Sequence, residues 1–413
     1  MEYPVYEKYQ LSRLEWLDVI PHHWDVARLR LLSNRYSGGT PSKDNLAYWQ
    51  EGTIPWLNSG SVNQGTITKP SAYITELGLK ESSAKWVPEK AIIIALAGQG
   101  KTKGTAAYAT FKTTCNQSMG VVVFERDHPR FMYWWLVSQY KNIRGMASDD
   151  ARDGLNLEML GVIPCPLPGM QEQQKIATFL DYKTRQIDRL IEKKKSLIEK
   201  LEERRIAVIT QAVTKGLDKD VKIKPSGVDW LGDVPEHWEV KPVKFMTQII
   251  RGKFSHRPRN DPAFYDGEYP FIQTGDVAQA GKYVESFTQT LNERGYFVSK
   301  EFPAGTLIMT IAANIGDMAI INFNACFPDS IVGFVPEDDV QLNYLFYMFV
   351  AMKKKLMSTA VLNTQLNLNV DRIASLVSVC PPVEEQFLIY EYLDLEVNRI
   401  DSVKRKWKTP FFL

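Results

Sequence analysis

The amino-acid sequence predicts an α+β fold in which two repeated globular α/β units are separated by long antiparallel coiled-coil helices. Three observations lead to this prediction. A charged stretch in the middle of the chain carries apolar residues at heptad spacing, and a tryptophan-rich segment occurs twice at one fixed offset. In addition, the residues that begin the central stretch return near the C-terminus. The predicted order is therefore globular unit, long helix, globular unit, helix.

The central stretch, residues 171–215, predicts one uninterrupted helix. Glu, Lys and Arg fill most of its polar positions, and no Pro or Gly occurs before Gly216. At 1.5 Å per residue it would be about 65 Å long. A narrow apolar seam of this kind needs a partner helix; the alternative is an exposed, salt-bridged helix. The seam consists of Ile176, Leu180, Ile187, Leu190, Leu197, Leu201 and Val208, and Lys183, Lys194 and Arg204 interrupt it.

The repeat is clearest in two short segments. WLDVIPHHWDV, residues 16–26, returns as WLGDVPEHWEV, residues 230–240. Two Trp and a Pro that match without gaps are unlikely to coincide by chance, so the chain is an internal duplication. The matching pairs are Trp16/Trp230, Leu17/Leu231, Pro21/Pro235, His23/His237, Trp24/Trp238 and Val26/Val240.

Each repeat predicts a strand-rich unit with one core helix. In the first unit, residues 91–97 and 118–124 are typical of buried strands, and residues 131–140 are typical of a core helix. The second unit has the same order of segments. Its strands are predicted in 267–277, 305–323 and 330–335, and its helix in 342–357.

The start of the central helix is also duplicated. Residues 165–188 are echoed by 379–401, with Glu172-Gln173 matching Glu385-Gln386 and Leu180-Asp181 matching Leu393-Asp394. The partner of the central helix is therefore expected to be the chain's own C-terminal helix, from about residue 382 to about residue 408. Since that helix is short, we expect it to pair with the first half of the central helix. The second half, from about Ser196, would then be left for a partner subunit.

The predicted domain boundaries follow from these segments. They are 1–168 for the first unit, 169–216 for the central helix, 217–380 for the second unit and 381–413 for the shortened C-terminal helix.

Composition is that of an ordinary globular protein. The 413 residues are 44% hydrophobic and 24% charged, with a net charge of +2. The four cysteines lie far apart without a CxxC pair, which indicates reduced thiols and neither a disulfide framework nor a zinc site. The N-terminal residues contain no apolar signal region, and no apolar run reaches membrane-spanning length. A cytoplasmic location is expected.

In this order and duplication, the motifs resemble the specificity subunit of type I restriction-modification systems. The resemblance covers essentially the whole chain. It rests on the paired WLG-x-P-x-HW segments, the GGTPS-x5-YW-x4-IPW run at 38–56, the P-x3-EQ helix entries and the AVTKGLD stretch at 212–218. The chain departs from the pattern at its end, where the second helix stops at TPFFL without a counterpart to the rest of the central helix.

The resemblance implies a non-catalytic DNA-recognition subunit. Two target recognition domains would each read half of a bipartite, asymmetric site in double-stranded DNA, and the coiled coil would hold them apart. Two modification subunits that bind S-adenosylmethionine and methylate adenine would dock on the chain, together with restriction subunits that translocate DNA. S-adenosylmethionine, ATP and Mg would belong to those partners. Contact with a partner subunit is expected at Lys183, Ile187, Leu190, Lys194, Leu197 and Leu201.

One segment imitates a phosphate-binding loop. ALAGQGKT, residues 95–102, follows a predicted strand, but a Thr-rich, strand-like run comes next instead of the helix that such a loop must open. Nucleotide hydrolysis through Lys101 is therefore disfavoured. Two interpretations stay open: Lys101 and Lys103 reach DNA phosphates from a loop, or they are solvated lysines.

Motifs for catalysis and for metal binding do not stand out. The sequence has no Asn/Asp-Pro-Pro-Tyr/Phe motif for a flipped adenine, no glycine-rich cofactor loop and no Ser/His/Asp elbow. The five histidines lack metal spacing, and His23 and His237 recur with Trp and Pro, which favours a packing role. No metal site is expected.

Polar and basic loops are the best candidates for contact with DNA. The stretch at 251–260 is the strongest of them, because so many like charges in ten residues are costly without a polyanion. An exposed flexible loop is the alternative. The predicted DNA-binding residues are Thr40, Ser42, Lys43, Asn58, Ser59, Ser61, Lys101 and Lys103 in the first unit, and Arg251, Lys253, His256, Arg257, Arg259, Gln273 and Thr274 in the second. The rival to DNA recognition is a coiled-coil adaptor whose globular units bind proteins.

Overall fold

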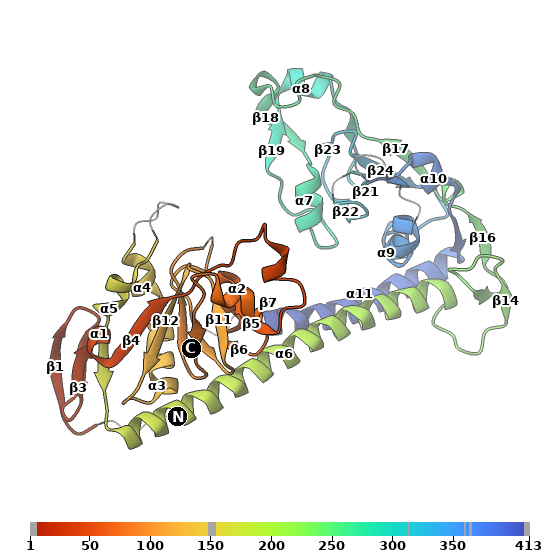
Figure 1. The fold of residues 1–413 in the computed structure, drawn as a ribbon. Helices are drawn as coiled ribbons and strands as arrows, with labels where there is room; N and C mark the ends of the chain where they lie inside the picture. The colour runs from red at the N-terminus through yellow and green to blue at the C-terminus, as the bar shows by residue number, and fades with distance from the viewer. Residues whose placement is uncertain are drawn as a thin grey trace. The chain divides into compact units, whose positions relative to one another are not determined.

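The computed structural model describes residues 6–98, 100–147, 154–312, 314–358, 361–362 and 366–408. It divides into two compact units, Met1–Leu190 and Ile191–Leu413. A single helix, α6 (Met170–Lys215), begins in the first unit and ends in the second (Figure 1). The predicted uninterrupted central helix is thus confirmed.

The first unit is built on two small sheets. A five-stranded sheet has the order β4-β12-β9-β10-β6, and a four-stranded sheet has the order β7-β5-β11-β8. The strands of the first sheet are β4 (Ser33–Ser37), β12 (Met119–Phe124), β9 (Ile92–Ala95), β10 (Ala106–Ala109) and β6 (Thr66–Ile67). Those of the second are β7 (Ala72–Ile74), β5 (Ile54–Leu57), β11 (Thr113–Cys115) and β8 (Trp86–Val87). The predicted buried strands at 91–97 and 118–124 are confirmed as β9 and β12.

Short strand pairs and helices complete the first unit. The strand pairs are β1 (Tyr9–Leu14) with β2 (Leu17–Pro21), and β3 (Asp25–Arg28) with β13 (Pro164–Leu167). The helices are α1 (Leu29–Leu32), η1 (Leu46–Tyr48), η2 (Ser59–Gln64), α2 (Glu76–Lys80), α3 (Pro129–Ser138), α4 (Tyr140–Gly145) and α5 (Leu157–Gly161). The core helix that the sequence predicts at 131–140 is confirmed as α3, which ends at Ser138.

The second unit repeats this plan. One four-stranded sheet has the order β17-β24-β21-β22 and another the order β19-β18-β23-β20. Their strands are β17 (Thr247–Arg251), β24 (Ile331–Pro336), β21 (Thr306–Thr310), β22 (Met318–Ile321), β19 (Gln289–Leu291), β18 (Tyr265–Phe271), β23 (Ala325–Cys326) and β20 (Glu301–Phe302). A parallel bridge between Tyr283 and Ile320 stands where β6 pairs with β10 in the first unit. The predicted duplication is therefore a duplication of topology.

Further strand pairs and helices complete the second unit. Its strand pairs are β14 (Ile223–Pro225) with β15 (Asp233–Pro235), β16 (Glu239–Pro242) with β27 (Val377–Cys380), and β25 (Val361–Leu362) with β26 (Leu366–Asn367). Its helices are η3 (Val243–Phe245), η4 (Pro262–Phe264), α7 (Thr274–Gln279), α8 (Glu293–Phe297), α9 (Leu342–Ser358), α10 (Val370–Ser375) and α11 (Val383–Lys408).

The Glu-Gln pair at the start of each long helix bonds that helix to neighbouring segments of its unit. Gln386 is buried; it donates to the carbonyl of Pro381 (2.8 Å) and accepts from the amide of Gln341 (2.8 Å). In the first unit Gln173 is also buried, donates to the Pro168 carbonyl and accepts from the His128 amide. The neighbouring glutamates each bind the histidine of the repeated segment. The pairs are His23 with Glu172 and His237 with Glu385. This explains why the sequence repeats both motifs.

Helix α11 runs antiparallel to α6 within the second unit (Figure 1). Arg205 of α6 pairs with Asp401, and Glu202 pairs with Lys404, so the partner number rises as the α6 number falls. Buried apolar residues from the two helices also share one core cluster. Its members include Ile209, Ala212 and Val213 of α6 and Ile389, Leu393 and Val397 of α11.

The prediction of which half of α6 is paired is wrong. Helix α11 pairs with the second half, because α6 ends and α11 begins beside the same globular unit, and an antiparallel partner must run back from there. Apolar residues of the preceding stretch, Ile187, Leu190 and Leu197, are exposed instead, Leu190 by 65%. Residues 409–413, where the sequence predicts the end of the helix, lie outside the described residues.

An aspartate ties the core helix of each unit to a long helix. In the first unit Asp181 of α6 accepts hydrogen bonds from Arg130 Nε (2.8 Å) and Trp134 Nε1 (2.8 Å). The Arg130 guanidinium carbon lies 4.8 Å from the ring centroid of Tyr108 and 4.6 Å from that of Tyr133. A cation held between aromatic faces and a carboxylate is a favourable arrangement.

The second unit builds the same arrangement with a different cation. Asp394 of α11 accepts from Lys282 Nζ (2.6 Å) and from the Tyr347 hydroxyl (2.6 Å). The ammonium faces four aromatic rings, those of Tyr283, Phe346, Tyr347 and Tyr390. Burial lowers the pKa of Lys282, and the hydrogen bond that Lys282 donates to Asp394 opposes that shift. Since Asp181 and Asp394 match in the repeat, the motif Leu-Asp marks this tie.

Candidate nucleic-acid interface

The basic stretch at 251–260 is a well-anchored loop that follows β17. The Gly252 amide donates to the Ile331 carbonyl (2.9 Å), and the Lys253 amide donates to the Phe327 carbonyl (3.0 Å). Phe254 is buried in an aromatic cluster that includes Phe271 and Phe264. The backbone is thus fixed while the charged side chains stay on the surface.

Two arginines of this loop point to one carboxylate. Arg257 and Arg259, whose side chains are 53% and 44% exposed, both form ion pairs with Asp329. Arg251 Nε donates to the backbone carbonyl of the same Asp329 at 2.7 Å. Arg257 also donates to the carbonyls of Phe254 (2.6 Å) and His256 (2.8 Å). The structure therefore brings three of the predicted DNA-binding residues together around a residue that was not predicted.

His256 and Lys253 flank this group. The His256 ring stacks on Phe264 with 3.9 Å between centroids, and its Nε2 lies 3.2 Å from Asp261 Oδ2. His256 is half-buried, so its role in the loop is partly structural. The Lys253 side chain is exposed. Gln273 and Thr274 lie at the start of α7, where Gln273 donates to Gln289 Oε1 (2.9 Å).

The corresponding loop of the first unit carries little charge. Thr40 donates to Gln117 Oε1 (2.5 Å), and the Ser42 carbonyl accepts from Trp49 Nε1 (2.9 Å). Ser42 and Lys43 are exposed. This loop is positioned as the basic loop is, since the Gly38 amide donates to the Met119 carbonyl at the equivalent point.

The other predicted residues of the first unit differ in accessibility. Asn58 is exposed and Ser59 is half-buried, whereas Ser61 is buried and its hydroxyl lies 2.5 Å from that of Ser71. Ser61 is therefore not on the surface in this structure.

Lys101 and Lys103 differ in the exposure of their side chains. Lys101 is exposed, but Lys103 is only 7% exposed, because the loop folds back over α4. Arg144 of α4 donates to the carbonyl of Gly100 (2.7 Å), and a Cβ on Gly104 would meet the Arg144 backbone at 3.3 Å. The expectation that both lysines face solvent or DNA is thus corrected for Lys103. In the described residues that follow this loop, 100–109, the next element is the strand β10 and not the helix that a phosphate-binding loop must open.

Comparison with known proteins matches these two units to one family. The family profile described as type I restriction modification DNA specificity domain matches residues 21–200 and again residues 235–408. The chain belongs to this specificity-domain family. The two matches are the two halves of the repeat.

Individual relatives agree with the assignment. The EcoR124I/EcoR124II specificity subunit of Escherichia coli is 24% identical over 203 residues, 48% of this chain and 45% of that protein. The MjaIX specificity subunit of Methanocaldococcus jannaschii is 26% identical over 278 residues, 65% of this chain and 61% of that protein. The matched part of the chain thus spans between 45% and 61% of the length of these relatives.

Solved structures share the fold. A chain from a type I restriction-modification system, studied for complex assembly and conformational transition, superposes with a TM-score of 0.72 at 16% identity. It covers 94% of this chain and 93% of its own length. The HsdS subunit from Thermoanaerobacter tengcongensis gives 0.55 at 15% identity, with 95% and 93% coverage. At these identities the likeness establishes the specificity-subunit fold.

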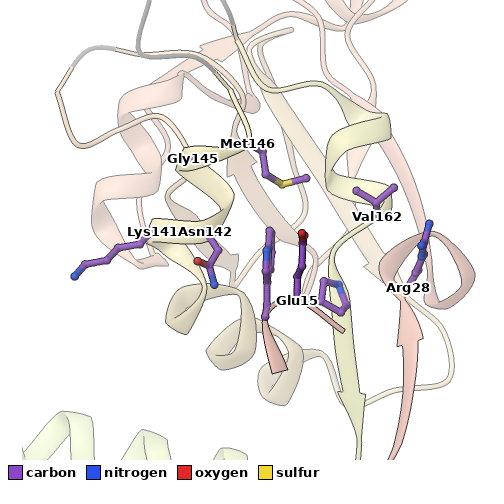
Figure 2. A pocket seen from close by; sticks show the side chains of 9 residues that line it. Glu15, Arg28, Lys141, Asn142, Gly145, Met146 and Val162 are labelled. Atoms are coloured by element: carbon purple, nitrogen blue, oxygen red, sulfur yellow. The ribbon is translucent and has the colours of Figure 1, made fainter. Parts of the chain in front are cut away.

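The first unit of this specificity-domain chain also contains a cavity of about 680 Å³. Figure 2 shows Met146 and Glu15 at this cavity, with Lys141 extending away from it. The lining residues are Glu15, Trp16, Arg28, Lys141, Asn142, Gly145, Met146, Val162 and Pro164. None of them belongs to the predicted DNA-binding set.

The part of the chain that the structure describes contains thiols and other potential metal ligands. No group of three His, Cys, Asp or Glu residues there could hold a metal ion. Burial raises the pKa of the Cys115 and Cys165 thiols to about 12, so they stay protonated at neutral pH. Among the described helices, none is long and apolar enough to cross a membrane.

Sequence reasoning missed Asp329 and the two glycines that seat the loops. A Cβ on Gly38 would lie 2.0 Å from the Cys115 carbonyl oxygen, and one on Gly252 would lie 2.3 Å from that of Pro328. These glycines are related by the offset that relates Trp16 to Trp230, so extending the repeat by twelve residues would have found them. No comparable signal connects Asp329 to the basic loop, because they are about seventy residues apart.

Proposed function

We propose that this chain is the DNA sequence-recognition subunit of a type I restriction-modification complex. It reads a bipartite, asymmetric site in double-stranded DNA, one half through each unit, and it scaffolds two methyltransferase subunits and the restriction subunits. It has no catalytic role of its own. The chemistry, with S-adenosylmethionine, ATP and Mg, belongs to the partners, and the complex acts on DNA in the cytoplasm.

One observation carries this proposal. The same two-sheet scaffold occurs twice and presents a loop at the same point, after β4 and after β17, but the two loops differ in chemistry. The first has Thr40, Ser42 and Lys43, whereas the second has Arg251, Arg257 and Arg259. A shared scaffold with different polar side chains is what the reading of two different half-sites requires.

Reversing the charge of the basic loop should weaken binding to DNA. In the complex with its methyltransferase partner, Arg257→Glu/Arg259→Glu is expected to lower the affinity for the cognate duplex by about 100-fold at moderate salt. The plot of log affinity against log salt should become shallower by about 2. Fluorescence anisotropy with a labelled duplex over a salt series measures both, and sequencing of methylated adenines in cells identifies the duplex.

The control is Lys219→Glu/Lys222→Glu, which changes net charge equally at exposed positions between α6 and β14. It should leave both quantities nearly unchanged. Equal losses in the two variants would indicate a non-specific electrostatic effect. If the complex binds DNA without any sequence preference, the recognition role is wrong and the protein-binding adaptor gains support.

A further inference from the structure

The carboxylate of Asp329 occupies the position of an anion in the basic loop. Asp329 lies in the turn before β24, and its two oxygens face Arg259 and Arg257, the latter at 3.6 Å. Arg251 is bound to its backbone carbonyl. Guanidinium groups that converge on a carboxylate are also arranged to bind a phosphate, because the two anions offer similar oxygens.

The first unit shows that the scaffold itself does not need this acid. Backbone bonds from Gly38 to Met119 and from Gly252 to Ile331 align the two turns, and this alignment makes Gln117 the counterpart of Asp329. Gln117 is neutral and accepts from Thr40. The acidic residue is therefore present in the unit whose loop carries arginines, and the shared fold does not require it.

The ion pairs are weak enough for DNA to compete with them. All three side chains are at least one-third exposed, and ion pairs exposed to water contribute little to stability. The carboxylate nevertheless has two effects. It cancels one positive charge of the loop, and it limits the orientations of Arg257 and Arg259.

These two effects should change the affinity for cognate DNA and the affinity for other DNA in different ways. Contact with DNA of any sequence depends mainly on positive charge beside phosphates, which the carboxylate reduces. Contact with the correct site depends also on side chains held in one orientation, which the carboxylate favours. We propose that Asp329 is a specificity-determining residue, an inference that depends on the proposed DNA-recognition function. It suppresses binding of the basic loop to DNA in general and preserves binding to the recognised half-site.

The test is Asp329→Asn, which keeps the shape and removes the charge. In the complex with the methyltransferase partner, affinity for a duplex without the site should rise about tenfold, and its salt dependence should steepen by about 1. Affinity for the cognate duplex should stay level or fall, so discrimination drops by tenfold or more. The control Asp338→Asn makes the same charge change at an exposed position in the same unit and should alter neither.

A second variant guards against a folding defect. Combining Asp329→Asn with Arg259→Gln restores the loop's net charge, so the salt dependence on the duplex without the site should return to the wild-type value. Equal discrimination in wild type and Asp329→Asn would overturn the inference, as would a parallel loss of binding to both duplexes. If the wild-type complex itself shows no sequence preference, the proposed function fails, and that result is separate from any effect of Asp329.

Discussion

Replacing Leu393 with alanine is expected to lower the free energy of unfolding of the second unit by about 3 kcal/mol. Leu393 of α11 is 0% exposed and belongs to the core cluster that also contains Val213 of α6 and Tyr344 of α9. The truncation leaves a cavity where two long helices and the globular core meet. Hydrogen exchange of amides in β21 and α9, measured on the full chain along a urea series, reports on this unit.

Leu395 provides a matched control two residues away on the same helix. It is 64% exposed, so Leu395→Ala should cost less than about 0.5 kcal/mol. Similar losses in the two variants would mean that α11 packs through a different face. The pair therefore tests the arrangement of α6 and α11 that the structure shows and that the sequence did not predict correctly.

The reason for that error is physical. A heptad pattern tells which face of a helix is apolar, but it contains no information about how far along its partner a short helix lies. Leu190 and Leu197 belong to the same apolar seam as Val208, yet both are exposed, whereas Val208 packs against the core cluster to which α11 contributes. The pairing is decided by where the two helices join the second globular unit. The structure shows that the end of α6 and the start of α11 both lie beside that unit.

Elements with strong local signals were predicted well. The run of buried isoleucines in β9 and the helix α3 were found because their patterns are local. The candidate site was predicted in part. Charge density located the arginines of the basic loop, but the burial of Lys103 and Ser61 depends on how loops fold onto distant elements. Asp329 was missed for the same reason, since its partners come from another strand connection.

The second large effect is expected at the tie between α11 and the core helix α9. Asp394→Ala should lower the free energy of unfolding of the second unit by about 2–3 kcal/mol. The variant leaves the ammonium of Lys282, whose side chain is only 16% exposed, without its carboxylate, and it leaves the Tyr347 hydroxyl without its acceptor. On the same helix, Glu396→Ala breaks the pair with Arg399, whose side chain is 75% exposed, and should cost no more than about 0.5 kcal/mol.

The dependence on pH has a definite sign. Because burial lowers the pKa of Lys282 in the folded state, the unfolded chain holds this proton more tightly, and folding stability from this group rises as pH rises between the folded and the unfolded pKa values. Asp394 opposes the shift, so its removal lowers the folded pKa further. The loss in Asp394→Ala should therefore be largest while Lys282 is charged and should shrink as the pH rises through its folded pKa.

A double variant separates the cost of an unpaired charge from the loss of a contact. Methionine is similar in length to lysine and packs well against aromatic rings, so Lys282→Met keeps the space between Tyr283, Phe346 and Tyr390 filled. Lys282→Met/Asp394→Ala should then be more stable than Asp394→Ala alone, because no buried ammonium is left unpaired. Additive losses in the urea series would show that Lys282 and Asp394 act independently, and the tie would then be two separate contacts.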